Sequence, residues 1–287
     1  MVGEWEAEFR LSITRALADQ LATTLAALVP TPLRQDYVSR VRARPGVYEL
    51  FVDGERVYVG KAAKSLNARL GQHLRKLSGR SNIDLADVRF VCTYVDEDLD
   101  AAAPERLLIK QYRASESVPW NTNGFGNKDP GRNRDNSVVK AAHFDAIYPI
   151  DLQHHVALSS EVQTLEGALD DAKAALPYLL RFDNSSAARR VYRSGTVVLP
   201  SRPLPVTDLA TSLVAALPLG WQLTALPGYL ILYQETRAYE SALGWWRSRS
   251  DQIVDYQPGP SRFAAGGVEA DDVSSDPAEP DPGDPSS

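Results

Sequence analysis

The sequence has very little cysteine: Cys92 is the only one in 287 residues, so no intramolecular disulfide can form. This favours a reducing compartment, and we expect a cytoplasmic protein. A long apolar run is also missing, because two prolines and two glycines interrupt the most apolar stretch, residues 217–233. We therefore expect no membrane span, and the acidic N-terminus argues against a secretory signal.

Several catalytic signatures are missing as well. The sequence contains no Ser-His-Asp constellation, no glycine loop ending in Gly-Lys-Ser/Thr and no cysteine–histidine cluster with metal-ligand spacing. The pair His154-His155 is adjacent, so its two rings point in different directions and we do not interpret it as a metal site. Hydrolysis by a serine triad and nucleotide binding by a phosphate loop are therefore not predicted.

The charge is unevenly distributed. Residues 269–287 carry seven acids and no lysine or arginine, so the rest of the chain has a net charge of +1 although the whole has −6. A run of seven cations without an intervening acid lies upstream: Arg56, Lys61, Lys64, Arg69, Arg75, Lys76 and Arg80. Such a run suits a phosphodiester substrate, and it is also typical of a solvated helix face.

A tyrosine-bearing hairpin is predicted near the start of the cation run. Residues 46–52 and 55–59 have strand-like patterns, and Asp53-Gly54 between them is typical of a tight primed turn. Tyr48 and Tyr58 project from one face if the strands pair there. A strand tyrosine taken alone is most often a packing residue, so the surrounding residues must decide its role.

A helix is predicted to follow, beginning after a capping Ser65 and ending near Gly79. Its apolar stripe consists of Leu66, Leu70, Leu74 and Leu77. Its basic side consists of Arg69, His73, Lys76 and Arg80. We expect the guanidinium and the imidazole, one turn apart, to work on a phosphate.

A carboxylate begins the next apolar stripe. After a third predicted strand at residues 88–95, a second helix is predicted over residues 101–114, with Glu105 on the same side as Leu108, Ile109 and Tyr112. A glutamate in a first turn is favourable to the helix dipole. One that points inward needs a partner, and a divalent cation is such a partner.

Trp120-Asn121 and a Gly/Asn-rich loop over residues 122–136 come next. The loop carries Lys128, Arg132 and Arg134, whose side chains suit guanine edges in a major groove. The alternative is an ordinary surface loop whose cations contact phosphates. With the helix and turn cations, the predicted DNA contacts are Lys64, Lys76, Arg80, Lys128, Arg132 and Arg134.

The remaining segments predict a second α+β region. We expect helices at 4–29, 158–182, 207–217 and 239–249, with Pro177 as a point at which the second of these kinks or ends early. We also expect a strand at 191–199 and a hairpin formed by 222–226 and 229–234. The predicted domains are a helical arm (1–40), a hairpin-containing domain (41–150), a C-terminal α+β extension of unknown role (151–256) and a disordered acidic tail (257–287).

The ordered set of residues resembles a known family. Gly46-Val47-Tyr48 and Tyr58-Val59-Gly60 resemble the paired signature of the GIY-YIG nuclease superfamily. The later residues resemble its branch of type II restriction endonucleases that cut a palindrome of only G and C. These later residues are Arg69, His73, Glu105, Pro119-Trp120-Asn121 and the stretch from Gly124 to Gly131.

The resemblance implies an α+β fold with a small core, in which a β-hairpin and a third strand are flanked by helices. It implies an active site formed by Tyr48, Tyr58, Lys61, Arg69, His73, Glu105 and Asn121. Glu105 would be the ligand of Mg²⁺, for which Mn²⁺ substitutes. It further implies a homodimer that cuts double-stranded DNA at CCGCGG, and a cognate methyltransferase acting on the same site.

The chain departs from the family pattern in two ways. The connection between the two tyrosines is a tight turn, whereas relatives can carry longer insertions that embrace DNA, and the C-terminal extension lies outside the resemblance. Two other functions stay open: a repair or homing nuclease acting on structured DNA, and a DNA-binding module that does not cleave.

Overall fold

The computed structural model describes residues 13–95, 108–110, 112, 118–126, 131–250 and 253–266. The chain divides into two compact units. Among the described residues, the N-terminal unit holds 13–72 and 84–121, and the C-terminal unit holds 73–83 and 122–266. Within the described residues the divisions fall at 72/73, 83/84 and 121/122, whereas the sequence predicted a domain boundary at residue 150.

The N-terminal unit contains a four-stranded antiparallel sheet with the order β1-β4-β2-β3. Its strands are β1 (Thr31–Pro32), β2 (Gly46–Val52), β3 (Glu55–Ala62) and β4 (Val88–Tyr94). The tight turn predicted between β2 and β3 is present, with positive φ angles of 52° at Asp53 and 84° at Gly54. The predicted hairpin and third strand are therefore confirmed.

Helices flank this sheet as an α+β fold requires. They are α1 (Ile13–Ala26), α2 (Gln35–Val38), α3 (Leu66–Ser78) and the 3-10 turns η1 (Leu85–Asp87) and η3 (Pro119–Asn121). The hydroxyl of Ser65 accepts a hydrogen bond from the backbone N–H of Ala68 at 3.2 Å, which confirms the predicted helix start. Leucines of α1 pack with Val47, Val59 and Val91 of the sheet.

The C-terminal unit contains a five-stranded sheet with the order β13-β12-β10-β11-β7. These strands are β7 (Leu180–Phe182), β10 (Gln222–Ala225), β11 (Leu230–Tyr233), β12 (Gly244–Ser250) and β13 (Ile253–Pro258). β7 runs parallel to β11, and the other pairs are antiparallel. Two small sheets pair β5 (His155–Val156) with β9 (Leu204–Pro205), and β6 (Val162–Thr164) with β8 (Thr196–Val198).

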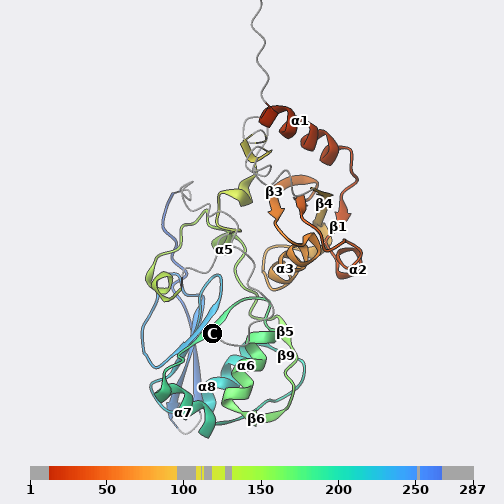
Figure 1. Cartoon of the computed structure of the whole chain (residues 1–287). Coiled ribbons are helices and arrows are strands. Elements are labelled where there is room, and N and C mark those ends of the chain that lie inside the picture. Colours follow the sequence, from red (N-terminus) through yellow and green to blue (C-terminus); the bar gives the residue numbers. More distant parts are fainter. Residues whose placement is uncertain are drawn as a thin grey trace, which may run out of the picture. The chain divides into compact units, whose positions relative to one another are not determined.

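The helices of this unit are α5 (Phe144–Ile147), α6 (Leu165–Ala175), α7 (Ser186–Ser194), α8 (Val206–Ala215) and the 3-10 helix η4 (Arg132–Asn136). α6 and α8 cover one face of the five-stranded sheet, where Leu223, Leu232 and Trp246 point into the main core (Figure 1). The other face buries a second cluster that includes Ile231 and Trp245. Burial on both faces explains why the central strand β11, Leu230–Tyr233, consists of Leu, Ile, Leu and Tyr, all of them buried.

Three sequence predictions in this unit were wrong in extent or type. Residues 158–182 form β6, α6 and β7 and not one helix, because Thr164 caps α6 and the helix ends before Pro177. The strand predicted at 191–199 begins at Thr196, after α7. The helix predicted at 239–249 contains β12, in which Trp245 and Trp246 point to opposite faces of the sheet.

The C-terminal end of the described chain is more ordered than its composition predicted. β13 pairs along β12, and Ala264 donates a backbone hydrogen bond to the carbonyl of Val139 at 2.9 Å. The segment from residue 257 to 266 is therefore part of the C-terminal unit. The rest of the predicted disordered tail lies outside the described residues.

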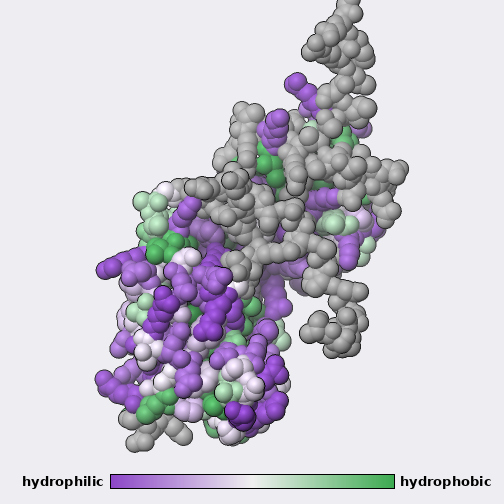
Figure 2. All heavy atoms as spheres, turned by 60° about the vertical axis from the view of Figure 1, so that its left-hand side comes forward, coloured by the Kyte–Doolittle hydropathy of each residue, from purple (hydrophilic) through white to green (hydrophobic). Residues whose placement is uncertain are grey.

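The surface of the described residues is mixed in character. On the face shown in Figure 2, hydrophobic side chains stand in small groups between hydrophilic ones. None of the helices in the described ranges has the length and apolar character needed to cross a membrane.

A buried carboxylate, Asp145 on α5, holds together the first part of the C-terminal unit. Its Oδ1 accepts from Nη1 of Arg80 at 2.9 Å, and its Oδ2 accepts from Nη2 of Arg134 at 3.1 Å. Burial raises the pKa of Asp145, but the charges of Arg80, Lys76, His143 and Arg134 outweigh that effect and lower the pKa to about 2. Burial also lowers the pKa of His143 to about 4.

These shifts predict an acid-sensitive fold. The folded-state pKa of His143 lies below the unfolded value of 6.5, so the unfolded chain takes up this proton first as the pH falls. His143 makes its full contribution to the free energy of unfolding above pH 6.5. As the pH falls towards 4, this contribution is lost and the free energy of unfolding decreases by about 2–3 kcal/mol. Asp145 adds a further loss as the pH falls from 3.8 to about 2.

Urea unfolding measured at intervals from pH 8 to pH 4 tests this expectation. His143→Asn keeps an acceptor for the N-cap position of α5 but cannot titrate, so its stability should fall less steeply below pH 6.5 than that of the wild type. His155→Asn, at an exposed position on β5, is the matched control. Equal pH slopes for the wild type and His143→Asn would contradict the assignment.

Candidate active site

The two signature tyrosines lie on one face of the hairpin. In the register of β2 and β3, Tyr48 opposes Gly60 and Leu50 opposes Tyr58, so the tyrosines are diagonal neighbours. Their ring centroids are 6.1 Å apart with an interplanar angle of 41°. Both side chains are buried, and the predicted pairing of the two phenols on one face is present.

Gly60 allows this arrangement because the phenol of Tyr48 crosses directly over it. A Cβ atom at position 60 would lie 2.2 Å from Oη of Tyr48 and 2.7 Å from a ring carbon of Tyr58. No side chain fits in that space. The glycine that follows Tyr58-Val59 in the signature therefore has a steric role: it makes room for the first tyrosine.

Arg69 brings a cation to this phenol from α3. Its Nε donates to Oη of Tyr48 at 3.3 Å, and its Nη1 donates to Oε1 of Gln72 at 3.2 Å. The side chain is half-buried, so part of the guanidinium remains accessible to solvent. A phosphate group placed beside the phenol would meet this positive charge.

Asn121 fixes the strand that carries Tyr58. Its Oδ1 accepts from the backbone N–H of Val59 at 2.9 Å, and its Nδ2 donates to the carbonyl of Val59 at 2.7 Å. Among the described strands β3 is at the edge of the sheet, so none of them pairs with these backbone groups. The amide of Asn121 takes the place of such a strand, which makes Asn121 a positioning residue.

The two lysines of this segment lie apart from the phenols. Strand alternation places Lys61 opposite Val47, on the sheet face away from Tyr48 and Tyr58. Lys61 was one of the predicted active-site residues, and its side chain is on the other face of the sheet. Lys64 is exposed in the turn before α3.

His73 follows Arg69 by one turn on α3 and belongs to the C-terminal unit. Its side chain is only 4% exposed, and its ring stacks on Phe125 with a centroid distance of 4.9 Å and an angle of 20°. The predicted exposed basic side of the helix is therefore interrupted at His73. The stacking fixes the orientation of the imidazole.

Two predicted site residues, Glu105 and Lys128, lie outside the described residues. The apolar stripe expected beside Glu105 is present as far as it is described, because Leu108, Ile109 and Tyr112 are all buried. Within the described ranges, no three His, Cys, Asp or Glu side chains converge to form a metal site.

The predicted basic run is not one continuous surface. Arg56 forms a buried ion pair with Glu49 at 3.0 Å, and Arg80 forms one with Asp145. Arg75 donates to the carbonyls of Ala174 and Leu176 at the end of α6. These three cations hold the fold together, so the predicted DNA contact at Arg80 is replaced by a buried structural role.

The other predicted DNA contacts differ in accessibility. Arg132 is exposed, with its guanidinium 4.3 Å from the ring centroid of Tyr233. Arg134 is half-buried against Asp145, and Nζ of Lys76 donates to the carbonyl of Phe125 at 2.6 Å.

Sequence reasoning missed three buried carboxylates, namely Asp145, described above, Glu49 and Asp135. Glu49 points away from Tyr48 on β2 and pairs with Arg56 of β3. Asp135 of η4 accepts from Arg181 at 2.6 Å and from the hydroxyl of Tyr229 at 2.7 Å. For Glu49 a signal existed, because an acid inside an apolar strand with an arginine on the next strand is typical of a buried pair. Asp135 offered no such signal, because its arginine is 46 residues away in sequence.

Comparison with known proteins identifies the family of the segment that carries these features. Residues 46–155 match a protein-family model described as the Eco29kI GIY-YIG domain, a type II restriction endonuclease domain. No curated protein matches the chain. Residues 46–155 belong to the GIY-YIG nuclease superfamily, in its branch of type II restriction endonucleases, and DNA is the substrate that such a domain cleaves.

The positioning role of Asn121 leads to a stability prediction. Asn121→Ala leaves two buried backbone groups of Val59 without partners, so the free energy of unfolding should fall by about 1–3 kcal/mol. Asn133→Ala, at an exposed position in η4, is the matched control and should change it by less than about 0.5 kcal/mol. Urea denaturation measures both. Equal effects of the two substitutions would contradict the role.

Proposed function

We propose that the chain is a sequence-specific double-strand DNA endonuclease, a type II restriction enzyme that hydrolyses phosphodiesters with one divalent metal and a tyrosine general base. The observation that carries this proposal is the hydrogen bond from Nε of Arg69 to Oη of Tyr48. It joins a phosphate-binding cation to a proton acceptor. Gly60 and Asn121 hold the surrounding hairpin in place.

The arrangement favours Tyr48 over Tyr58 as the base. The guanidinium of Arg69 stabilises negative charge on Oη of Tyr48, so this phenol can take a proton from the attacking water. The water oxygen forms a bond to phosphorus while the bond from phosphorus to the 3′-oxygen breaks, and the leaving oxygen takes up a proton. Arg69 offsets the charge that grows on the phosphate, and His73 is our candidate for relaying the proton.

Glu105 would hold the metal. A single carboxylate, completed by waters and the phosphate, is a donor set that Mg²⁺ accepts, and Mn²⁺ would substitute. The metal would supply Lewis-acid stabilisation of the phosphate oxygens. The described residues near the two phenols contribute cations and hydroxyls, so Glu105 is the oxygen donor that the set still requires.

For recognition we propose a homodimer acting on a GC-only palindrome of the CCGCGG type, protected in the cell by a methyltransferase of the same specificity. The tight turn at Asp53-Gly54 leaves the hairpin without a long insertion that could embrace DNA. The segment of residues 122–136 then supplies base contacts. Arg132 is the most accessible arginine of η4 and suits guanine.

Digestion of mixed-sequence DNA with Mg²⁺, followed by sequencing of the ends, tests the function. We expect metal-dependent cuts at discrete GC-only sites. Glu105→Ala should abolish cutting and retain specific DNA binding, whereas Glu161→Gln, an exposed acid of the C-terminal unit, should cut normally. Discrete cutting by Glu105→Ala would refute the metal site, and nicking confined to branched DNA would favour a repair or homing nuclease.

Arg69→Ala tests the transition-state role. Removing one donor of this kind should lower the single-turnover cleavage rate about 10²–10³-fold while the dissociation constant for DNA changes little. Arg89→Ala, at an exposed position on β4, removes the same charge and should leave the rate unchanged. A proportional loss of binding and rate in Arg69→Ala would assign this residue to ground-state binding instead.

A further inference from the structure

A group of arginines lies just before the hairpin, in a segment that the family match does not cover. Residues 40–44 have the sequence Arg-Val-Arg-Ala-Arg, and the match begins at residue 46. Arg40, Arg42 and Arg44 are all exposed. Alternating arginines without an intervening acid form a strongly basic surface, and we call residues 40–44 the arginine segment.

The acids that flank this segment in the sequence are already paired with other arginines. Asp36 accepts from Nε and Nη2 of Arg34 at 3.1 and 3.2 Å. Glu49 is buried and pairs with Arg56. Within the described residues, the first two arginines of the segment form no ion pair with an acid. The positive charge of these two side chains is therefore available to an anion from outside the chain.

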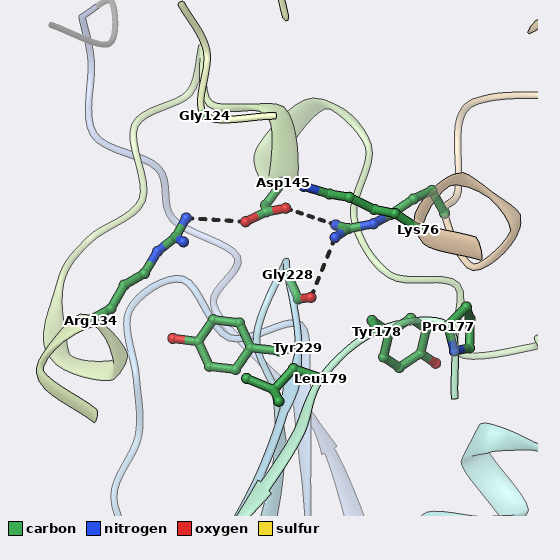
Figure 3. A pocket seen from close by; sticks show the side chains of 10 residues that line it. Lys76, Gly124, Arg134, Asp145, Pro177, Tyr178, Leu179, Gly228 and Tyr229 are labelled. Carbon is green, nitrogen blue, oxygen red and sulfur yellow. Dashed lines mark hydrogen bonds and ion pairs between the residues drawn. The ribbon is translucent and has the colours of Figure 1, made fainter. Parts of the chain in front are cut away.

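The arginines of the C-terminal unit differ in this respect. Arg80 and Arg134 each donate to one oxygen of Asp145, and the dashed lines in Figure 3 mark these contacts. An anion that approached these arginines would compete with a buried carboxylate. At the first two arginines of the arginine segment, an anion would meet no such competitor among the described residues.

Aromatic rings hold the guanidinium groups of these two arginines. The guanidinium carbon of Arg42 lies 4.4 Å from the ring centroid of Tyr94, and that of Arg40 lies 5.7 Å from the ring centroid of Tyr37. Oη of Tyr94 also accepts from the backbone N–H of Arg42 at 2.9 Å. A guanidinium that stacks on a ring keeps the N–H groups at its edge for a phosphate.

The first turn of α3 holds the arginine segment at both ends. Nδ2 of Asn67 donates to the carbonyl of Val38 at 2.7 Å, and the backbone N–H of Leu66 donates to the carbonyl of Arg44 at 2.9 Å. Arg69 of the candidate active site is on the same helix. The segment and the candidate active site therefore share one support within the N-terminal unit.

The strand register places Tyr94 on the same face of the sheet as Tyr48. Tyr48 of β2 opposes Cys92 of β4, and Gly46 opposes Tyr94. Residues two apart on a strand share a face, so Tyr48 and Tyr94 are diagonal neighbours, whose Cα atoms are typically about 7–8 Å apart. Phosphates on one strand of duplex DNA recur about every 3.4 Å along the helix axis. A DNA strand with one phosphate at Tyr48 can therefore place another, about two nucleotides away, at Tyr94.

We propose that the arginine segment binds the DNA backbone beside the scissile phosphate. Arg42 contacts a phosphate about two nucleotides from the cut, and Arg40 adds a second phosphate contact. Such contacts fix the position of the DNA without reading its sequence. The inference rests on the proposed function, because the scissile phosphate at Tyr48 is its reference point.

Fluorescence anisotropy without metal tests the phosphate contacts, with a labelled duplex that contains CCGCGG as the probe. Arg40→Gln and Arg42→Gln should each reduce the slope of log K against log salt by about 0.9, measured between about 50 and 200 mM KCl. Each should weaken binding equally on a duplex with a scrambled site. Arg89→Gln is the matched control. It removes an exposed arginine from the opposite face of the same sheet and should keep the wild-type slope.

A neutral phosphate analogue locates the contact of Arg42. A methylphosphonate placed about two nucleotides from the cut, which the digest with Mg²⁺ maps, should weaken binding by the wild type. The same analogue should not weaken binding by Arg42→Gln further, because the charge that it removes no longer has its partner. Equal losses in the wild type and Arg42→Gln would refute this placement.

The outcomes separate this inference from the proposed function. An unchanged slope in both arginine variants, or an equal reduction in Arg89→Gln, would overturn the inference, while cleavage by the wild type would leave the proposed function intact. A reduced slope in a protein that cuts no duplex would refute the proposed function and the placement beside a scissile phosphate. Thermal unfolding verifies that each variant is folded, and Arg40→Gln decides the question if Arg42→Gln is not.

Discussion

The ring of Tyr48 crosses Gly60, and the rest of the hairpin depends on this close approach. In the observed register of β2 and β3 these two residues are opposite each other, and no Cβ fits at position 60, so this register requires a glycine there. This register makes Tyr58 a diagonal neighbour of Tyr48 and places the Oη of Tyr48 within reach of Arg69. Asn121 then closes the free edge of β3 at Val59. One steric requirement thus fixes the geometry of several groups that are distant in sequence.

In the C-terminal unit, buried carboxylates hold distant segments together, as the contact of Tyr48 with Gly60 does in the hairpin. Removing one partner of a buried pair typically costs about 3–5 kcal/mol, so such pairs strongly favour one arrangement of the segments they join. Asp135 ties η4 to Arg181 of β7, and Asp145 ties α5 to Arg80 and Arg134. Of these partners, Arg80 and Arg134 are within the family match, which covers residues 46–155, and Arg181 lies beyond it. The C-terminal extension therefore completes the fold around η4.

Local patterns predicted the parts of the fold that are determined locally. The turn at Asp53-Gly54, the cap at Ser65 and the alternation of β2 need only neighbouring residues, and the sequence indicated all three. β12 was predicted as a helix because its identity depends on burial of Trp245 and Trp246 on opposite sides of a sheet formed by distant strands. The same distinction applies to the candidate site. The order of the motifs pointed to Tyr48 and Arg69 as site residues. The pairing of Asn121 with Val59 could not be predicted from local patterns, because the two residues are 62 positions apart in the sequence.

Some positively charged side chains of this chain stabilise the fold and are not available to bind an anion. Arg56 and Arg80 neutralise buried acids, and Arg75 caps α6, so none of the three is available to a DNA backbone. Each phosphate that a protein neutralises adds about 0.9 to the slope of log K against log salt. These three cations therefore contribute little to counterion release. Phosphate contacts position a protein on DNA without reading its sequence, so discrimination between sequences depends on base contacts and DNA shape.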